Sequence, residues 1–468
     1  MQYLSTRGGI KPISFTEAVI MGLGEDGGLL LPRTIPRIGK ETFSSWKQLN
    51  YQQLAYEIMS RFIDDIAATD LQKIINRSCA NFTNPAITPL LPVGDIHILE
   101  LFHGPTLAFK DIALQFLGNL FEYLLNRDNS VLNIIGATSG DTGSAAIYGV
   151  RGKQRINIFI LHPKDRISKV QEKQMTTVTD ANVFNIAIEG SFDDGQARIK
   201  EIFNDTEFKK QYHLGAINSI NWARILAQVV YYVYSTIEIV RTEQETAVDF
   251  SIPTGNFGDI FAGYIARRML PEGTIRQLIL ATNDNDILSR AICSGDYSLG
   301  EVKATSSPSM DIQAASNFER YLYYLMDSDS SKTRKIMESF AARGKLDFTS
   351  HLDQLKRDFA ASAISEQDVE DTIALFYQRY HYLLDPHTAV GVGAALRNKT
   401  SGIPIICLAT AHPAKFPDTV AKATGITPQA AALKGLLTKE AKCKIMPADK
   451  ILLQKYIEEN ALRYEENT

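Results

Sequence analysis

A lysine occupies an unusual place in the segment HGPTLAFKD of this 468-residue chain. Lys110 stands where the apolar run Ile96 to Phe102 gives way to a helical pattern of apolar residues that starts at Ile112. A positive charge at a helix start opposes the helix dipole by up to about 1 kcal/mol, so this position favours a neutral amine. A neutral lysine amine is a nucleophile that can form a Schiff base with a carbonyl group. The alternative is a surface lysine whose stem lies along Phe109 and whose ammonium group reaches water.

A glycine-rich turn, GATSGDTG, follows the expected strand at residues 131–135. Its small residues let backbone amides and hydroxyls close around an anion. No Gly-Lys-Ser/Thr follows, which excludes a P-loop for nucleoside triphosphates. Ser139 also lacks the GxSxG frame of a nucleophile elbow. An ordinary turn capped by Asp141 or Thr142 remains the alternative.

A second turn, PTGNFGD, repeats this position in another strand–helix unit. Gly255 and Gly258 flank Asn256 and Phe257, so successive backbone amides could converge on a phosphate at the helix N-terminus. The alternative is a type I turn capped by Asp259.

The third turn, LATAHPAKFP, follows a late strand. Thr410 is expected at the carboxyl end of that strand, with its hydroxyl free to meet a ligand nitrogen. His412 is interpreted as a turn residue rather than a base.

Short runs rich in Val and Ile alternate with helical patterns, which predicts an α/β fold with mainly parallel sheets covered by helices. In such folds ligands bind at the carboxyl ends of strands, where the three turns are expected. Strands are expected at residues 96–102, 131–135, 157–161, 183–188, 214–217, 248–252, 275–280 and 403–408. Helices are expected at residues 168–175, 192–203 and 221–239 and starting at residues 111, 144 and 259.

Composition narrows the function classes. The chain is 45% hydrophobic and 22% charged, which suits two or three domains with large cores. A net charge of −4 provides no basic field for nucleic acid. Four scattered cysteines without a CxxC pattern indicate neither disulfides nor a metal site, and favour a reduced compartment. Without a hydrophobic signal or an apolar run of ~20 residues, the expectation is a soluble cytoplasmic protein with no membrane association.

Taken together, these motifs resemble threonine synthases of the fold type II pyridoxal phosphate class. The resemblance covers nearly the whole chain: YLSTRGG, GLGEDGGLLLP, FHGPTLAFKD, ATSGDTGSAA, SINWARILAQ, PTGNFGD, SPSMDIQAASNFER, DPHTAVG and ATAHPAKFP. The first two stretches are similar to the longer bacterial and fungal branch, which has an extra N-terminal domain.

The resemblance implies two doubly wound, mainly parallel-sheet domains of the tryptophan-synthase-β-like type. We expect an N-terminal domain at residues 1–92, a large cofactor-binding domain at 93–115 and 216–430, and a small substrate-closing domain at 116–215. Residues 431–468 are expected to form a helical C-terminal tail. The stretch from Asp327 to Tyr382 looks like an insertion, and Tyr321 to Leu325 like core packing.

The resemblance further implies a pyridoxal-phosphate-dependent carbon–oxygen lyase acting on phosphate. It would convert O-phospho-L-homoserine and water to L-threonine and phosphate, the last step of threonine biosynthesis. Lys110 would form the Schiff base with the cofactor, Thr410 would face its pyridine nitrogen, and Asp141 would lie near its phenolic oxygen. The cofactor phosphate would lie on Gly255, Asn256, Phe257, Gly258 and Asp259. The substrate carboxylate would lie on Thr138, Ser139, Gly140 and Thr142.

The substrate phosphate needs its own donors, because it carries nearly two negative charges. We expect Lys169, Asn218 and Arg224 to supply them, and the alternative for Arg224 is a plain surface charge. Lys164 and Arg166 in the same loop as Lys169 are interpreted as solvated. The sequence allows either a monomer or a homodimer.

Four other functions stay open. Lys110 and the glycine-rich turns would equally serve a serine or threonine dehydratase, or a β-replacement enzyme such as a cysteine synthase. A family offshoot could act on another phosphorylated amino alcohol. From a different class, the chain could be a colourless, non-catalytic binder of a phosphorylated ligand.

Overall fold

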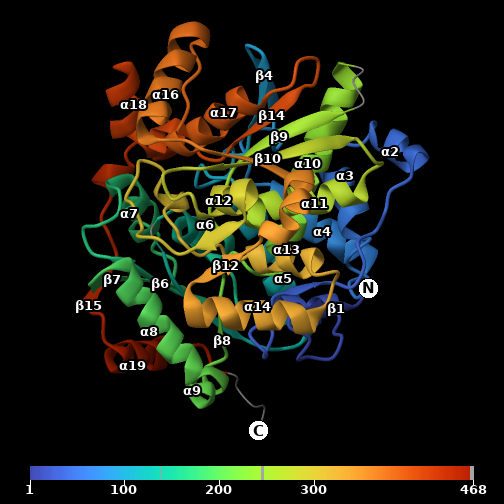
Figure 1. Cartoon of the computed structure of the whole chain (residues 1–468). Coiled ribbons are helices and arrows are strands. Elements are labelled where there is room, and N and C mark those ends of the chain that lie inside the picture. Colours follow the sequence, from blue (N-terminus) through green and yellow to red (C-terminus); the bar gives the residue numbers. More distant parts are fainter. Residues whose placement is uncertain (139, 244–246, 464–468) are drawn as a thin grey trace.

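The computed structural model describes residues 1–138, 140–243 and 247–463, and these residues form two main sheets covered by helices (Figure 1). The larger sheet has the strand order β13-β10-β9-β14-β4-β3. Every neighbouring pair in it is parallel except β3 and β4. Its strands are β3 Leu90–Val93, β4 Ile96–Glu100, β9 Val248–Pro253, β10 Ile275–Thr282, β13 Phe359–Ala363 and β14 Ile405–Ala409.

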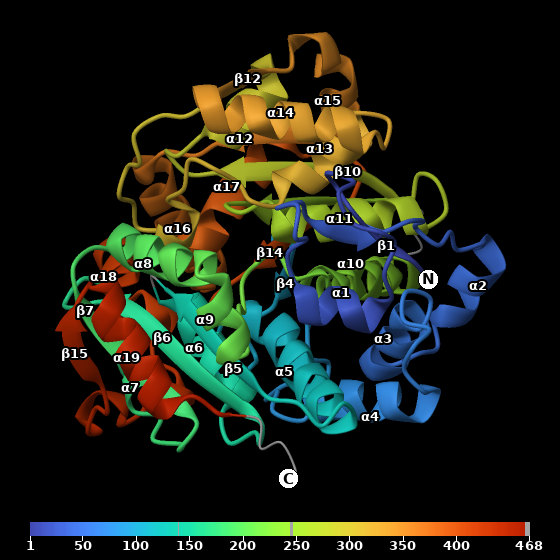
Figure 2. The ribbon, with the colours of Figure 1, turned by 90° about the horizontal axis from the view of Figure 1, so that it is seen from below.

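The smaller sheet has the order β15-β7-β6-β5-β8 and is parallel throughout. Figure 2 shows it in teal and green, with β15 in red, beside the part of the molecule that holds β10 and β14. Its central strand, INIFILHP, is buried at every residue, as expected of a parallel strand covered on both faces. The strands are β5 Leu132–Ala137, β6 Ile156–Pro163, β7 Val183–Glu189, β8 Leu214–Gly215 and β15 Lys444–Pro447. The predicted fold class is confirmed.

Helices cover both sheets. Helix α17 packs on β9, β10 and β14, while α10 packs on α11 and α5, and α5 packs on α6. The helices after the N-terminal region are α5 Lys110–Arg127, α6 Asp141–Val150, α7 Lys169–Thr176, α8 Phe192–Asn204, α9 Thr206–Gln211, α10 Trp222–Thr242, α11 Gly258–Met269, α12 Ile287–Ser294, α13 Phe318–Leu325, α14 Ser330–Arg343, α15 Leu352–Asp358, α16 Glu366–Tyr380, α17 Pro386–Asn398, α18 Pro417–Thr424 and α19 Lys450–Asn460. A separate two-stranded antiparallel ribbon joins β11 Asp296–Ser298 to β12 Lys345–Asp347.

The N-terminal region packs against α10 and shares its core. The Trp222 ring lies 6.1 Å from the Tyr3 ring and 6.0 Å from the Phe62 ring, measured between centroids. All three side chains are fully buried. The elements of this region are β1 Tyr3–Ser5, α1 Phe15–Met21, β2 Leu30–Pro32, α2 Lys40–Trp46, α3 Tyr51–Met59 and α4 Ala68–Cys79.

Helices α5 and α6 approach so closely that only glycine fits between them. A Cβ atom on Gly118 of α5 would lie 2.0 Å from the carbonyl oxygen of Gly149 on α6. Helix α6 follows β5 in the smaller sheet, whereas α5 follows β4 in the larger one, so this contact joins the two sheets. Helix α5 also runs through the boundary expected between residues 115 and 116, and the domain boundaries stay a prediction.

Two expectations for the second half of the chain were wrong. The stretch from Asp327 to Tyr382 is not a simple insertion, because it contributes β13, which pairs with β10 at the edge of the larger sheet. The tail after residue 431 is not only helical, because β15 pairs with β7 at the edge of the smaller sheet. Core packing by Tyr321 is confirmed, since its side chain is fully buried in α13.

Smaller differences concern element ends. Helix α6 begins at Asp141, three residues before the expected start, and β8 ends at Gly215. No helix in the described ranges has both the length and the apolar composition that a membrane span requires. Cys79, Cys293, Cys407 and Cys443 are all free thiols.

Candidate active site

Three turns meet at one edge of the larger sheet, because they follow strands that are neighbours. Strand β14 lies between β9 and β4 and is parallel to both, so their carboxyl ends lie together. The PTGNFGD turn follows β9, the ATAHPAKFP turn follows β14, and the Lys110 loop follows β4. The GATSGDTG turn follows β5 of the smaller sheet.

Lys110 is the first residue of α5, and its side chain is buried. Its Nζ atom donates to the hydroxyl oxygen of Ser309 at 3.3 Å. Burial lowers the pKa of Lys110 to about 8; Asp141 opposes this shift, whereas the cations Lys415 and Arg224 add to it. The sequence argument attributed a neutral amine to the helix start, but the structure attributes it first to burial.

The ATAHPAKFP turn holds the loop that carries Lys110. The amide of Phe109 donates to the carbonyl oxygen of Thr410 at 2.8 Å, and the amide of His412 donates to that of Leu107 at 3.0 Å. The amide of Thr410 donates in turn to the Thr388 hydroxyl at 3.2 Å. Thr410 is buried, and its carbonyl oxygen holds Phe109, the residue directly before Lys110.

The PTGNFGD turn has the backbone of an anion cradle. Phe257 has a φ of +62°, in the left-handed region, and its side chain is buried against the rings of Phe318 and Phe359 at 5.1 and 5.5 Å. A Cβ atom on Gly255 would lie 2.9 Å from the carbonyl oxygen of Ser309. Helix α11 begins at the next residue, Gly258, and the amides of a first helical turn have no partner within the helix, so they can bind phosphate.

Asp259 anchors this turn to helix α10. Its Oδ1 atom accepts hydrogen bonds from the hydroxyls of Tyr231 and Tyr232 on α10, the second at 2.8 Å. Burial raises the pKa of Asp259 to about 6, although both tyrosine hydroxyls oppose the shift. The backbone of Asn256 is held by Asn317, whose amide donates to the Asn256 carbonyl oxygen at 3.0 Å. The carboxylate therefore fastens α11 to α10, which leaves the backbone amides for a ligand.

The GATSGDTG turn is closed by a threonine hydroxyl. The Thr138 Oγ1 atom accepts hydrogen bonds from the amides of Gly140 at 3.0 Å and Gly143 at 2.9 Å. Gly140 has a φ of +140°, and a Cβ atom there would lie 2.5 Å from the Gln171 side chain. Thr142 is half-buried in the first turn of α6, and Ser139 lies outside the described residues.

Asp141 forms a buried ion pair with a lysine that the sequence argument did not select. Its Oδ1 atom lies 2.7 Å from Nζ of Lys415 and accepts from Nε2 of Gln171 at 2.8 Å. Burial alone would raise the pKa of Asp141, but Lys415, Lys110 and His387 hold it well below its usual range. This ion pair joins the turn after β5 to the turn after β14, one from each sheet.

Ser309, His387 and Asp385 complete the surroundings of the reactive amine. The Ser309 amide donates to Nε2 of His387 at 3.2 Å, and Nδ1 of His387 lies 3.0 Å from Oδ1 of Asp385. The Nε2 side of the ring thus meets the Ser309 backbone, and the Nδ1 side faces the carboxylate. Both DPHTAVG and SPSMDIQ carried the family resemblance, but no sequence spacing connects them to Lys110.

Arg224 is a buried cation, and two nitrogens of its guanidinium group lack partners among the described residues. Its Nε and Nη1 atoms form no hydrogen bond within the described part of the chain. Burial lowers the pKa of Arg224 to about 10. An uncompensated buried charge costs roughly 3–5 kcal/mol, which favours an anionic ligand at this position. Lys169 and Asn218, the other expected phosphate donors, are exposed, and the Asn218 side chain accepts from the Ile220 amide at 3.3 Å.

These features fit pyridoxal phosphate. A buried amine with a lowered pKa suits a carbonyl group, and a glycine-containing turn at the start of α11 suits a phosphate. Residues 84–408 match the protein-family model described as pyridoxal-phosphate dependent enzyme, and the chain belongs to this class. Residues 2–79 and 388–457 match the models described as threonine synthase N terminus and threonine synthase, C-terminal. The chain belongs to the threonine synthase family.

Relatives cover nearly the whole chain. The threonine synthase of Schizosaccharomyces pombe is 46% identical, over 90% of this chain and 88% of its own. The structure of PLP-bound threonine synthase from Brucella melitensis is 41% identical, with a TM-score of 0.95 over 98% of this chain and 99% of its own. The yeast threonine synthase structure is 44% identical, with a TM-score of 0.93 over 98% of both chains. These matches confirm the predicted family.

Proposed function

We propose that this chain converts O-phospho-L-homoserine and water to L-threonine and phosphate. The observation that carries the proposal is the buried Lys110 amine close to Arg224, whose Nε and Nη1 atoms have no hydrogen-bond partner among the described residues, together with the glycine-containing turn at the start of α11. The turn at the start of α11 suits the cofactor phosphate, and Arg224 suits a substrate that carries a phosphate of its own. A cytoplasmic location and a monomeric or homodimeric state belong to the proposal as well.

The chain's own residues have distinct roles in this reaction. Bound pyridoxal phosphate supplies the electron sink for carbanions at Cα and Cβ of the substrate. Lys110 holds the cofactor at rest, and its released amine removes the α-proton. Ser309 accepts a hydrogen bond from that amine and so keeps it in position. After phosphate leaves Cγ, water adds at Cβ.

The remaining polar residues orient the ligands. The amides of residues 255–259 hold the cofactor phosphate, and Thr410 offers a hydroxyl to the pyridine nitrogen. Because a hydroxyl cannot keep that nitrogen protonated as a carboxylate would, the electron sink is mild and elimination is favoured over transamination. The turn from Thr138 to Thr142, including Asp141, holds the substrate carboxylate and faces the phenolic oxygen. Arg224 binds the substrate phosphate, with Lys169 and Asn218 as further donors.

The absorption spectrum tests the proposal. The purified protein should absorb in the violet and release phosphate from O-phospho-L-homoserine, and Lys110→Ala should lose both properties. Lys345→Ala, at an exposed lysine remote in sequence from every turn of the site, is the matched control and should keep both. A coloured, active Lys110→Ala variant would contradict the proposal.

The products distinguish the other functions of this class. A threonine synthase yields phosphate and threonine in equal amounts from O-phospho-L-homoserine. A dehydratase yields pyruvate or oxobutyrate from serine or threonine, and a β-replacement enzyme requires a second nucleophile. A colourless protein that binds the phosphorylated substrate without turnover would favour the non-catalytic reading.

A further inference from the structure

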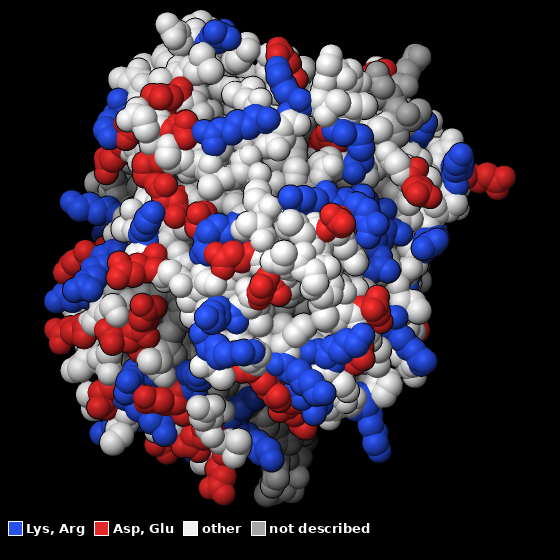
Figure 3. Space-filling model, viewed as in Figure 1, with Lys and Arg blue, Asp and Glu red and all other residues white. Residues whose placement is uncertain are grey.

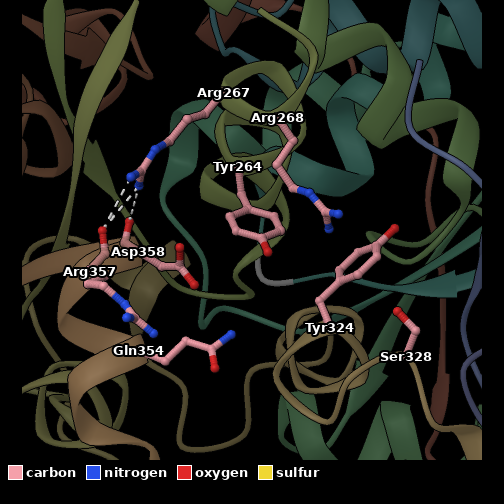
Figure 4. Close-up of a pocket in the computed structure, with 8 residues that line it drawn as sticks. All are labelled: Tyr264, Arg267, Arg268, Tyr324, Ser328, Gln354, Arg357 and Asp358. Atoms are coloured by element: carbon pink, nitrogen blue, oxygen red, sulfur yellow. Dashed lines mark hydrogen bonds between the residues drawn. The ribbon is translucent and has the colours of Figure 1, made fainter. Parts of the chain in front are cut away.

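A polar pocket lies at the opposite end of α11 from the candidate active site. Its cavity has a volume of about 420 Å³. Figure 4 shows the residues that line it: Tyr264, Arg267, Arg268, Tyr324, Ser328, Gln354, Arg357 and Asp358. Helix α11 spans 12 residues, and at 1.5 Å per residue its two ends are about 18 Å apart. The pocket is therefore separate from the turn that begins this helix.

Two of the three guanidinium groups in the pocket are fixed in place. The Arg268 guanidinium lies 4.4 Å from the Tyr324 ring centroid and 5.6 Å from that of Tyr264. Arg267 donates to the carbonyl oxygens of Asp358 at 2.9 Å and of Arg357 at 3.3 and 3.4 Å, as the dashed lines in Figure 4 show. A fixed guanidinium loses less conformational entropy when it binds a ligand than a free one does.

Donors and positive charge dominate this pocket. Its one carboxylate, Asp358, already accepts from the Tyr321 hydroxyl at 2.9 Å, and burial raises its pKa. In the described part of the chain, none of the three arginines forms an ion pair within 4.0 Å. Burial also raises the pKa of Tyr264 to about 12, so its hydroxyl stays protonated and can donate. Figure 3 shows basic side chains gathered beside the region where Figure 1 places α11.

We propose that this pocket binds a small multivalent oxyanion, either a phosphate ester or a polycarboxylate. Guanidinium groups bind both classes through paired, charge-assisted hydrogen bonds, and the volume lies within the usual range for small-molecule sites. The three arginines and the neutral Tyr264 hydroxyl line one cavity, and one oxygen of Asp358 accepts from the Tyr321 hydroxyl. This inference does not depend on the proposed reaction.

Isothermal titration calorimetry on the holoenzyme tests the inference, with inorganic phosphate and citrate as the probes. The double variant Arg268→Gln/Arg357→Gln should bind at least one probe ten-fold or more weakly than the wild type. Its cofactor absorbance and threonine formation should be unchanged, which also verifies that it is folded. A loss confined to phosphate identifies a phosphate ester, and a loss confined to citrate identifies a polycarboxylate.

Two further variants serve as controls for the double variant. Arg343→Gln, at an exposed arginine on α14 that does not line the pocket, removes a charge elsewhere and should bind like the wild type. Arg224→Ala should keep the component of the isotherm that the double variant loses. Equal affinities in the wild type and the double variant would overturn the inference, as would an equal weakening by Arg343→Gln or no binding of either probe to the wild type.

Discussion

At the scale of single residues, the lowered pKa of Lys110 comes first from burial and then from nearby charges. Burial lowers its pKa, and two other cations, Lys415 and Arg224, act in the same direction. Asp141 raises that pKa and so opposes the shift, and its carboxylate is also paired with Lys415 at 2.7 Å. The site thus contains three cations and one nearby paired carboxylate, which suits a cofactor and a substrate that each carry a phosphate.

The pKa of Lys110 predicts how cofactor uptake depends on pH. The unprotonated amine is the nucleophile, so the rate at which cofactor-free protein takes up pyridoxal phosphate should rise with pH through about 8 rather than through 10.5. Removing a nearby cation favours the protonated amine, so Arg224→Ala should move the midpoint to higher pH. Stopped-flow absorbance measures both midpoints. A midpoint that is the same in the variant would show that Arg224 does not influence Lys110.

His387 is predicted to act as a positioning residue through Ser309. His387→Leu removes the acceptor of the Ser309 amide and leaves that partly buried group unpaired, and such a loss costs roughly 1–3 kcal/mol when the group is kept from water. We expect kcat to fall about ten-fold, with little change in KM for the substrate, because ~1.4 kcal/mol corresponds to a factor of ten. The pH midpoint of the cofactor absorbance should shift as well, because the Ser309 hydroxyl contacts Lys110.

A conservative replacement separates this role from packing. Glutamine offers an acceptor of similar reach, so His387→Gln should restore most of kcat and the pH midpoint. If leucine and glutamine had the same effect on both quantities, His387 would serve packing alone.

The residues that could be predicted from sequence are those in continuous motifs. Lys110 and the three turns were identified because glycine-rich turns and strand ends leave local signals. Ser309 and His387 contact the site from positions 199 and 78 residues away in sequence from their partners. Lys415 lies in one of the recognised turns, but its partner Asp141 follows a strand of the other sheet. Such contacts depend on the packing of distant elements, which no local pattern reports.

At the scale of elements, central strands carry a local sequence signal, whereas edge strands depend on contacts with distant parts of the chain. The central strand β6 reads as an apolar run because helices cover both its faces. The edge strands β13, FAASA, and β15, KIMP, are short and only partly buried, so they lack that signal. Their place in the sheets depends on pairing with β10 and β7.

The contact between α5 and α6 predicts the effect of a single methyl group. Gly118→Ala would place a Cβ atom 2.0 Å from the Gly149 carbonyl oxygen, so the helices must separate. Overpacking of this kind typically costs about 1–3 kcal/mol. The free energy of unfolding, measured in urea, should fall by that amount. Gly300→Ala, where the added atom would meet nothing closer than 3.5 Å, is the control, and an equal effect of both substitutions would contradict the clash.

At the scale of the whole molecule, the C-terminal segment completes the smaller sheet. Strand β15 extends that sheet beyond β7, and Leu453 and Ile457 on α19 are fully buried in the core with Phe159 and Ile188. The segment that contains β15 and α19 thus covers apolar side chains of β6 and β7. The molecule therefore needs its last helix to close the core of the smaller sheet.

This arrangement predicts that one side chain in the last helix controls the stability of the smaller sheet. Leu453→Ala removes a buried side chain and leaves a cavity, which typically costs about 2–5 kcal/mol. Its neighbour Leu452 is 45% exposed, so Leu452→Ala should change the free energy of unfolding by less than about 0.5 kcal/mol. Urea unfolding measures the size of the loss in stability, and hydrogen exchange of the β6 and β7 amides in the native protein measures its place. Similar values for the two alanine variants would mean that α19 does not belong to this core. A large loss confined to Leu453→Ala, with faster exchange in β7, would show that the chain's last helix stabilises a sheet that begins more than 300 residues earlier.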